Sequence, residues 1–173
     1  VAQAVREQLA DRHARCGAHK EEREQRAAVV ELAAVVARVG GGGDAAEAAA
    51  ARLESIRRSH LRRRPQRFGD IGYHYAIDPA GRVWCCRPLS YQGAHVAGQN
   101  PGNLGIVVLG NYDRQSPNRA QKAAIVSFLS SQSSQYSVPV SRIKTHQELA
   151  ATACPGKSMQ RFMANIRSNG SLG

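Results

Sequence analysis

Two residues near the C-terminal end of the sequence could bind a metal ion together. His146 and Cys154 lie eight positions apart, and Pro155 and Gly156 follow them. Zinc binds imidazole nitrogen and thiolate sulfur in tetrahedral geometry, and a catalytic zinc site has three protein ligands and one position for water. The pair therefore predicts two of the three protein ligands of a hydrolytic zinc site. The third must come from another part of the chain.

The composition sets the size of the domain and its range of partners. The chain has 173 residues, 42% of them hydrophobic, which is enough for one domain with a core. No apolar run reaches the roughly 20 residues that span a bilayer, so we expect no membrane span. Residues 51–173 hold 17 of the 24 Lys and Arg but only 5 of the 13 Asp and Glu. This basic part is expected to meet an anionic partner, with nucleic acid and bacterial cell-wall polymer as candidates.

The first 43 residues differ in composition from the rest. Residues 1–26 predict a polar helix or a solvated arm, residues 27–39 a buried helix or a buried strand, and residues 40–43 a flexible glycine joint. We therefore divide the chain into a divergent N-terminal segment (1–43), a domain (44–168) and a short tail (169–173).

Helix signals recur three times in the domain. Asp44 is a suitable N-cap with Glu47 three residues later, and the Ala-rich stretch that follows should be helical. Ser116 and Pro117 predict a second helix, as its N-cap and first helical residue. Helices are thus expected over 44–60, 116–136 and 156–167.

Strand signals lie between the helices. Residues 71–77 alternate large side chains, and residues 82–85 return after the turn sequence Asp-Pro-Ala-Gly, so the two segments predict a hairpin. Residues 104–109 form a short apolar run between glycines, typical of a central buried strand. Residues 138–145 lead to His146 in a further short strand. The order of elements predicts a single α/β domain with a central mixed β-sheet flanked by helices.

Six motifs of this sequence occur in an order that resembles a known family. They are DIGYHY (70–75), DPAGRVW (78–84), GAH (93–95), Asn100, LGI with GN (104–106 and 110–111), and TH followed by TACPG (145–156). Over about residues 52–168 the chain is similar to the type 2 N-acetylmuramoyl-L-alanine amidases, which include phage amidase lysozymes and peptidoglycan recognition proteins. One motif alone is weak, but six in order at suitable spacings indicate the fold strongly.

The resemblance implies a reaction and a cofactor. Such enzymes use zinc, held by two His and one Cys, to cut the amide between the lactyl group of muramic acid and L-alanine. His146 matches the second His and Cys154 matches the Cys. The chemistry is consistent, because zinc lowers the pKa of bound water to about 7 and polarises the amide carbonyl.

The resemblance also implies residues around the metal. Tyr73 matches a tyrosine that assists the tetrahedral intermediate, and Thr152 falls where the family has Lys or Thr. His95 and Asn100, together with Tyr73, match positions that line the substrate groove. His74 is interpreted as packing on the face opposite Tyr73.

The first zinc ligand of the family has no counterpart. It belongs to an apolar strand, but the matching window, 30–41, contains no histidine. His60 matches a helix histidine that is not a family ligand, and the surroundings of His13 and His19 do not resemble a buried strand. Three explanations are open: the domain has lost the ligand and become a binding module, the N-terminal segment is not the native one, or His19 reaches in across the glycine joint. The composition change near Gly40 favours the second.

Another departure concerns the cysteines. Cys85 and Cys86 stand where the family commonly has an acidic residue and Gly, and we interpret them as structural. The four cysteines make a poor disulfide framework.

The leading functional hypothesis is a zinc-dependent N-acetylmuramoyl-L-alanine amidase acting on peptidoglycan. The alternative is a peptidoglycan-recognition domain that lacks the first zinc ligand. Nucleic-acid binding is disfavoured, because the arginines in 57–67 lack interleaved aromatic residues. In a fourth hypothesis Cys154 is a nucleophile with His146 as its base.

The resemblance implies a monomer in the cell envelope, periplasmic or extracellular, although the sequence starts without a signal-peptide pattern.

Overall fold

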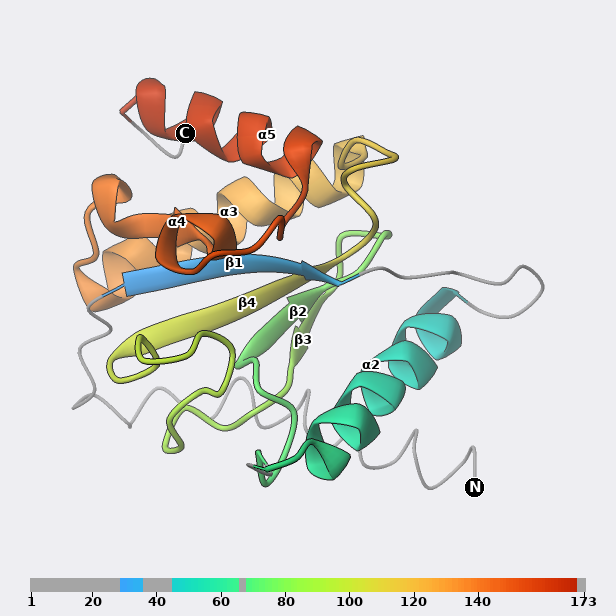
Figure 1. The fold of residues 1–173 in the computed structure, drawn as a ribbon. Coiled ribbons are helices and arrows are strands. Elements are labelled where there is room, and N and C mark those ends of the chain that lie inside the picture. Colours follow the sequence, from blue (N-terminus) through green and yellow to red (C-terminus); the bar gives the residue numbers. More distant parts are fainter. Residues whose placement is uncertain (1–28, 36–44, 66–67, 171–173) are drawn as a thin grey trace.

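The computed structural model describes residues 29–35, 45–65 and 68–170, and at its centre lies a five-stranded sheet (Figure 1). The strand order is β3-β2-β4-β1-β5. Strand β3 is antiparallel to β2, and all other neighbours are parallel, so the predicted mixed sheet is confirmed. The strands are β1 (Val29–Val35), β2 (Tyr75–Ile77), β3 (Val83–Cys85), β4 (Asn103–Leu109) and β5 (Ile143–Thr145).

Strand β4 occupies the centre of the sheet, as its unbroken apolar sequence predicts. All seven of its residues are buried. Ile106 and Val108 join one apolar cluster, and Val107 and Leu109 join the other, because successive side chains of a strand point to opposite faces. Burial on both faces is the reason that this strand shows no alternation of polar and apolar residues.

Strand β1 resolves the choice between helix and strand that residues 27–39 left open. Residues 29–35 pair in parallel with β4 along the whole strand, from Val29 opposite Asn103 to Val35 opposite Leu109. On its other side β1 pairs with β5. The sheet therefore includes part of the 1–43 segment. The predicted arm over 1–26, the glycine joint and the Asp44 cap lie outside the described residues.

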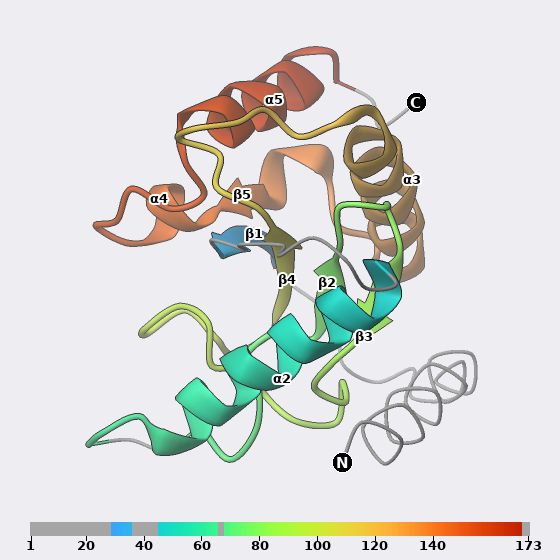
Figure 2. The ribbon, with the colours of Figure 1, turned by 90° about the vertical axis from the view of Figure 1, so that its right-hand side faces the viewer.

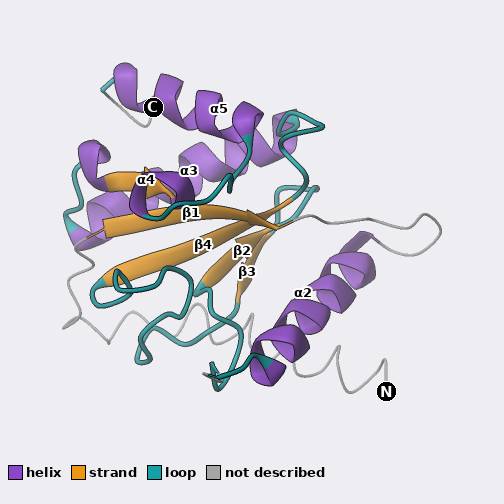
Figure 3. Cartoon of the chain, in the orientation of Figure 1, coloured by secondary structure: helices purple, strands orange, loops and turns teal. Residues whose placement is uncertain are grey.

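Helices cover both faces of the sheet. Figure 2 shows α2 on one face and α3 with α5 on the other, and Figure 3 shows the same layers by type of element. One core cluster lies between the sheet and α3 and α5, where Ile125 and Met159 are fully buried. The other lies under α2, where Leu53 and Ile56 pack. The helices are α2 (Ala45–Arg62), α3 (Arg119–Tyr136), α4 (His146–Leu149) and α5 (Lys157–Ser168).

The start of α3 differs from the prediction that Ser116 caps it. The N-cap is Asn118, whose side-chain oxygen accepts the Gln121 N–H at 2.9 Å, while Gln121 Oε1 accepts the Asn118 N–H at 3.3 Å. This reciprocal pair satisfies two N–H groups that a helix start leaves without partners. Ser116 has no Gln or Glu three residues later, so the helix begins two residues further on.

The hairpin of β2 and β3 is confirmed, with Ala76 opposite Trp84. Its turn is closed by Gly81, which has a φ of 81° and donates its N–H to the Asp78 carbonyl at 3.0 Å. The Asp78 carboxylate is fully buried and accepts from Arg82 Nε at 2.6 Å and from Trp84 Nε1 at 3.0 Å. The turn is therefore fixed by side-chain bonds as well as by its backbone.

Candidate metal and substrate site

The segment that carries His146 and Cys154 folds back on itself. His146 is the first residue of α4, directly after β5. The N–H of Gln147 donates to the Cys154 carbonyl at 2.8 Å, so the two predicted ligands come from adjacent stretches of backbone. The Thr152 hydroxyl accepts the Cys154 N–H at 3.2 Å. Thr152 is exposed, whereas His146 and Cys154 are half-buried.

The turn after Cys154 is restricted to glycine. Gly156 has a φ of 98° and is the N-cap of α5. A Cβ atom at Gly156 would lie 2.7 Å from the carbonyl carbon of Tyr112, which is too close for any side chain. The backbone of this turn thus packs directly on the chain that follows β4. Cys154 itself packs against the apolar cluster under α2, which contains Tyr73.

Tyr73 reaches that cluster because the alternation of residues 71–77 breaks at His74. Tyr75 belongs to the cluster under α3, whereas Ile71 and Tyr73 belong to the cluster under α2. His74 donates its N–H to the Gly105 carbonyl at 2.9 Å and accepts the Gly105 N–H on ring Nδ1 at 3.0 Å. Using the ring as acceptor replaces a regular ladder bond and bends the chain before β2 begins. The bend puts Tyr73 on the face where Cys154 lies.

His74 is buried and held on both ring nitrogens. Its Nε2 lies 3.1 Å from the Tyr91 carbonyl, to which it donates, because Nδ1 is an acceptor. Burial lowers the pKa of His74 to about 4, against the smaller opposing effect of the Tyr91 bond. The ring is therefore neutral at physiological pH. Its role in this structure is to hold the chain, which agrees with the interpretation that it packs.

Aromatic rings continue from Tyr73 in two directions. The His60 ring lies 5.8 Å from that of Tyr73 and 5.1 Å from that of Phe68, and the His95 ring stacks on that of Tyr73 at 6.1 Å. His60 Nδ1 accepts the Gly72 N–H at 2.9 Å. Burial, followed by the positive charges of nearby arginines, lowers the pKa of His60. Tyr73 thus lies near two imidazole rings, and the lowered pKa of His60 favours its neutral form.

His95 and Asn100, predicted to line the groove, lie in one short loop. The Asn100 side-chain oxygen accepts two backbone N–H groups, that of His95 at 2.9 Å and that of Val96 at 3.0 Å. The His95 ring is buried in a slot between Gly93 and Gly105, where a Cβ on either glycine would collide with it. Asn100 therefore shapes the loop that presents His95 to the Tyr73 ring.

Arg87 is a structural residue that the sequence analysis did not identify. It donates Nε to the Ile71 carbonyl at 2.8 Å and Nη1 to the Gln92 carbonyl at 2.5 Å, and it bonds the Phe68 carbonyl as well. One guanidinium thus joins the segments on either side of the hairpin. No sequence motif identifies an arginine with this role, because its hydrogen-bond acceptors are backbone carbonyls of residues distant in sequence.

Glu148 was also missed. Its Oε2 accepts the Thr145 N–H at 2.8 Å, as part of a capping box at the start of α4. Gln160 of α5 donates to Glu148 Oε1 at 3.0 Å and accepts from the Thr145 hydroxyl at 2.5 Å. The Thr-x-x-Glu spacing of a capping box was a usable signal. This network fixes the residue immediately before His146.

His146 and Cys154, the two zinc ligands expected from the resemblance, lie on backbone segments that a hydrogen bond joins. Within the part of the chain whose side chains are described, no three His, Cys, Asp or Glu side chains come together as a metal site. Strand β1 lies beside β5, and its positions in register with Val107 and Leu109 are Ala33 and Val35. Neither residue type carries a zinc-binding atom.

The two adjacent cysteines, Cys85 and Cys86, differ in whether they form a disulfide. Cys85 takes part in a disulfide, whereas the Cys86 thiol is buried and outside any disulfide. A disulfide at Cys85 fits its interpretation as a structural residue. In the described part of the chain, no helix combines the length and apolar character needed to cross a membrane.

Comparisons with known proteins agree with this architecture. Residues 34–157 match the family model described as N-acetylmuramoyl-L-alanine amidase. The chain is 36% identical over 95 residues to peptidoglycan-recognition protein SD of Drosophila simulans, covering 54% of this chain and 51% of that protein. It is 30% identical over 112 residues to the human N-acetylmuramoyl-L-alanine amidase, covering 64% of this chain and 19% of the enzyme. The chain thus spans about half or less of the length of these relatives.

A solved structure shares the fold. The human peptidoglycan recognition protein crystallised with a glycosamyl muramyl pentapeptide matches with a TM-score of 0.66 at 19% identity, covering 77% of this chain and 79% of that one. The match over most of the sequence, on a fold with the same sheet and flanking helices, leads to one conclusion. This chain belongs to the N-acetylmuramoyl-L-alanine amidase family, in which amidases and peptidoglycan recognition proteins share one fold.

Proposed function

We propose that this chain is a zinc-dependent N-acetylmuramoyl-L-alanine amidase that hydrolyses the lactyl–L-alanine amide of peptidoglycan. The observation that carries the proposal is the placement of Cys154 against the cluster that contains Tyr73, with the backbone beside His146 bonded to Cys154. A module that only binds its ligand needs neither an imidazole and a thiol on adjoining backbone segments nor a phenol in the cluster against which the thiol packs. Peptidoglycan as the substrate is supported by the human relative that was crystallised with a muramyl pentapeptide.

The residues have separable roles. His146 and Cys154 would hold zinc, which supplies a water of lowered pKa and polarises the scissile carbonyl. Tyr73, whose ring contacts those of His60 and His95, donates its hydroxyl to the oxygen that gains negative charge during attack. Thr152 orients the Cys154 backbone through its hydroxyl. His95 holds the Tyr73 ring in place by stacking on it.

A second function, recognition of peptidoglycan without hydrolysis, is favoured by one observation. Among the residues whose side chains are described, no three metal-binding side chains come together, and the β1 residues in register with Val107 and Leu109 are Ala33 and Val35, neither of which is a zinc-binding residue type. Two protein ligands hold zinc far more weakly than three. A domain that lacks the third zinc ligand would bind muramyl peptide at the same site but would not hydrolyse it, so no stem peptide would be released.

Zinc content and product release together separate the two functions. Zinc per chain is measured by elemental analysis on the full chain and on His146→Ala, and the release of stem peptides from purified cell wall is followed with and without a chelator. About one zinc per chain, lost in the variant, with chelator-sensitive release, supports the amidase. Binding to cell wall without zinc and without release identifies the recognition domain and refutes the amidase. Release that resists chelation but stops on thiol alkylation would indicate Cys154 as a nucleophile.

Location in the cell envelope or outside the cell belongs to the same proposal. Peptidoglycan is found there, and the disulfide at Cys85 supports an oxidising compartment. Reduction of that disulfide in a cytosolic extract, with loss of stability, would be consistent with this location.

A further inference from the structure

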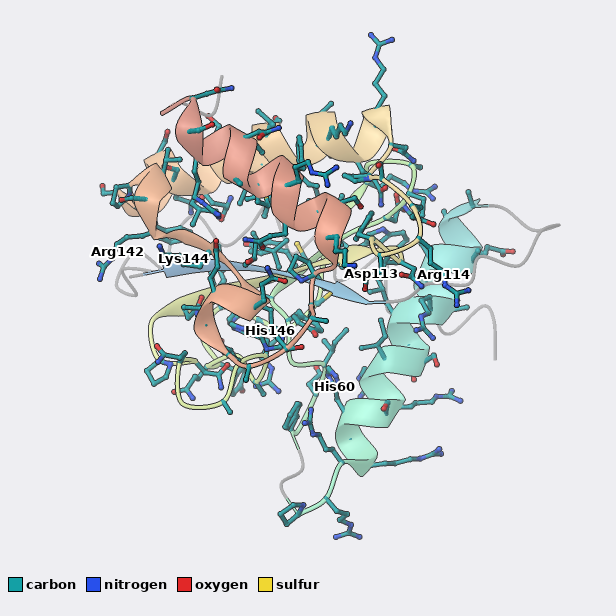
Figure 4. The ribbon with its side chains drawn as sticks, turned by 45° about the horizontal axis from the view of Figure 1, so that its top comes forward. His60, Asp113, Arg114, Arg142, Lys144 and His146 are labelled. Carbon is teal, nitrogen blue, oxygen red and sulfur yellow. The ribbon has the colours of Figure 1, made fainter. Side chains whose placement is uncertain are left out.

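A groove along α2 becomes cationic towards the C-terminal end of the helix. The groove has a volume of about 1170 Å³. At that end its lining includes guanidinium and hydroxyl groups from one stretch of sequence, namely Ser55, Arg58, Ser59, Arg62 and Arg63. We call these five residues, all of them exposed, the α2 basic face. Figure 4 shows nitrogen-tipped side chains that extend from α2 on the side away from the sheet, and His60 near the C-terminal end of the helix.

Helical periodicity explains why these side chains lie away from the core. Arg58 and Arg62 are one turn apart, and Ser55 lies three residues before Arg58, so they share one side of the helix. Leu53 and Ile56 are buried against the sheet and occupy the other side. The α2 basic face therefore contributes nothing to the apolar core.

Most of this positive charge has no carboxylate partner among the described residues. Arg58 Nε lies 2.9 Å from Glu54 Oε1, but the Arg58 side chain is 58% exposed, and an exposed pair of this kind contributes little. Arg62 and Arg63 form no ion pair within the described part of the chain. The Arg63 guanidinium lies over the Phe68 ring instead, 5.0 Å from its centroid.

Stabilisation of the helix end does not account for the whole cluster. A cation in the last turn interacts favourably with the helix dipole, but this effect falls off within that turn. Arg62 is the last residue of α2, so Arg63 and Arg64 lie beyond the helix. The charge of Arg63 also lowers the pKa of His60, after the larger effect of burial. This end of the groove therefore carries a positive potential, which attracts anions.

We propose that the α2 basic face binds a phosphodiester polymer of the bacterial cell wall, one that is attached to the peptidoglycan. Arginine suits phosphate because its planar guanidinium donates two parallel hydrogen bonds, and serine hydroxyls also contact phosphate oxygens. The described lining of the groove includes no Phe, Tyr or Trp, so it offers phosphate contacts without a platform for stacked bases. The disulfide at Cys85 supports an oxidising compartment, which favours a wall polymer over a cytosolic nucleic acid. The choice of polymer rests on the proposed cell-wall target, but not on hydrolysis.

The first test measures the affinity of the full chain for poly(glycerol phosphate) by calorimetry at several salt concentrations. Contacts between the three arginines and phosphates should make the affinity fall by roughly 20-fold between about 50 and 200 mM salt, because bound counterions are released. The variant Arg58→Gln/Arg62→Gln/Arg63→Gln should bind roughly tenfold more weakly at low salt and lose most of this salt dependence. Arg62→Gln alone, a change at one exposed side chain, should reduce the salt dependence by about one phosphate contact.

A matched control removes the same charge elsewhere. Arg114→Gln/Arg119→Gln/Arg161→Gln replaces three exposed arginines outside α2 and should keep the native affinity. Thermal unfolding checks that each variant folds. An equal loss of affinity in the control, or no loss in the α2 variants, overturns the inference. Tighter binding of duplex DNA than of poly(glycerol phosphate) also overturns it, because the face would then be a nucleic-acid site.

The second test uses purified cell walls, either intact or stripped of their phosphodiester polymers with hydrofluoric acid. We expect the native chain to bind intact walls more tightly than stripped walls, and the α2 triple variant to bind both alike. Equal binding of the two preparations by the native chain overturns the inference. Stripped walls keep the muramyl peptide, so binding to them and release of stem peptide from them test the proposed function separately.

Discussion

Arg167 Nη2 lies 2.6 Å from Glu148 Oε1 and ties the last helix to the turn that begins with His146. Arg167 also donates to the Ile143 carbonyl at 3.1 Å, so one guanidinium holds both the start of β5 and the residue that caps α4. The two side chains are only 18% and 27% exposed. Removing either one leaves the other partly desolvated and without its partner. The position of His146 therefore depends on α5, distant in sequence.

Arg167→Met should lower the free energy of unfolding by about 1–2 kcal/mol, because it deletes two bonds to partly buried acceptors while keeping an apolar stem. Urea denaturation of the full chain measures the change. Arg161→Met is the control, since Arg161 is exposed on the same helix. Equal shifts for the two variants would show that the Glu148 contact contributes nothing specific.

Acid should destabilise the fold through His74. Its pKa is about 4 in the folded chain and 6.5 when unperturbed, so the unfolded chain takes up the proton more readily. The contribution of neutral His74 is complete above pH 6.5 and is lost as the pH falls towards 4, by up to about 3 kcal/mol. The lowered pKa of His60 acts in the same direction.

Urea midpoints measured from neutral pH down to about pH 4 test this dependence. His74→Gln should be less stable at neutral pH, because it gives up the Gly105 and Tyr91 bonds, and its stability should vary less with pH. A variant with the same pH slope as the native chain would exclude His74 as the source.

The central strand and the hairpin turn could be predicted from the sequence. The face of the sheet on which Tyr73 lies could not. The buried run 104–109 and the hairpin turn at Gly81 carry local signals, and both were found as expected. Alternation alone would place Tyr73 and Tyr75 on one face. The bend that separates them arises from the bonds between His74 and Gly105, residues 31 positions apart. Hydrogen bonds between residues so far apart produce no periodic pattern in the sequence, so they cannot be predicted from it.

The site was predictable where its residues are close in sequence. The spacing of His146 and Cys154 suggested that they converge, and their backbones are joined through Gln147. The strand expected to carry the first ligand is present as β1, but its position beside β5 follows from pairing across the sheet. The absence of histidine from the window 30–41 was evident from the sequence, but the strand was expected at residues 35–39, whereas the described strand β1 covers Val29–Val35. Sequence reasoning could not decide what completes the metal site, because that depends on residues distant in the chain.

Gly105→Ala should destabilise the fold although alanine normally suits a strand better than glycine. An added Cβ would collide with the His95 ring, lying 2.5 Å from Nε2 and 2.7 Å from Cγ. Overpacking of this kind costs about 1–3 kcal/mol. A double-mutant cycle with His95→Ala tests the cause, because removal of the ring should abolish most of the penalty. An unchanged penalty in the His95→Ala background would place the clash elsewhere.

Tyr73→Phe should separate catalysis from binding. The phenyl ring keeps the packing against His60 and His95, so folding and zinc content should match those of the native chain. Loss of one hydrogen-bond donor to a developing oxyanion costs about 100- to 1000-fold in rate, and the release of stem peptide should fall by that factor. Tyr75→Phe is the matched control, since Tyr75 is buried in the cluster on the opposite face of the sheet and should leave the rate unchanged. A Tyr73→Phe variant with native rate and native zinc would remove the phenol from the mechanism and leave the metal as the sole stabiliser of that charge.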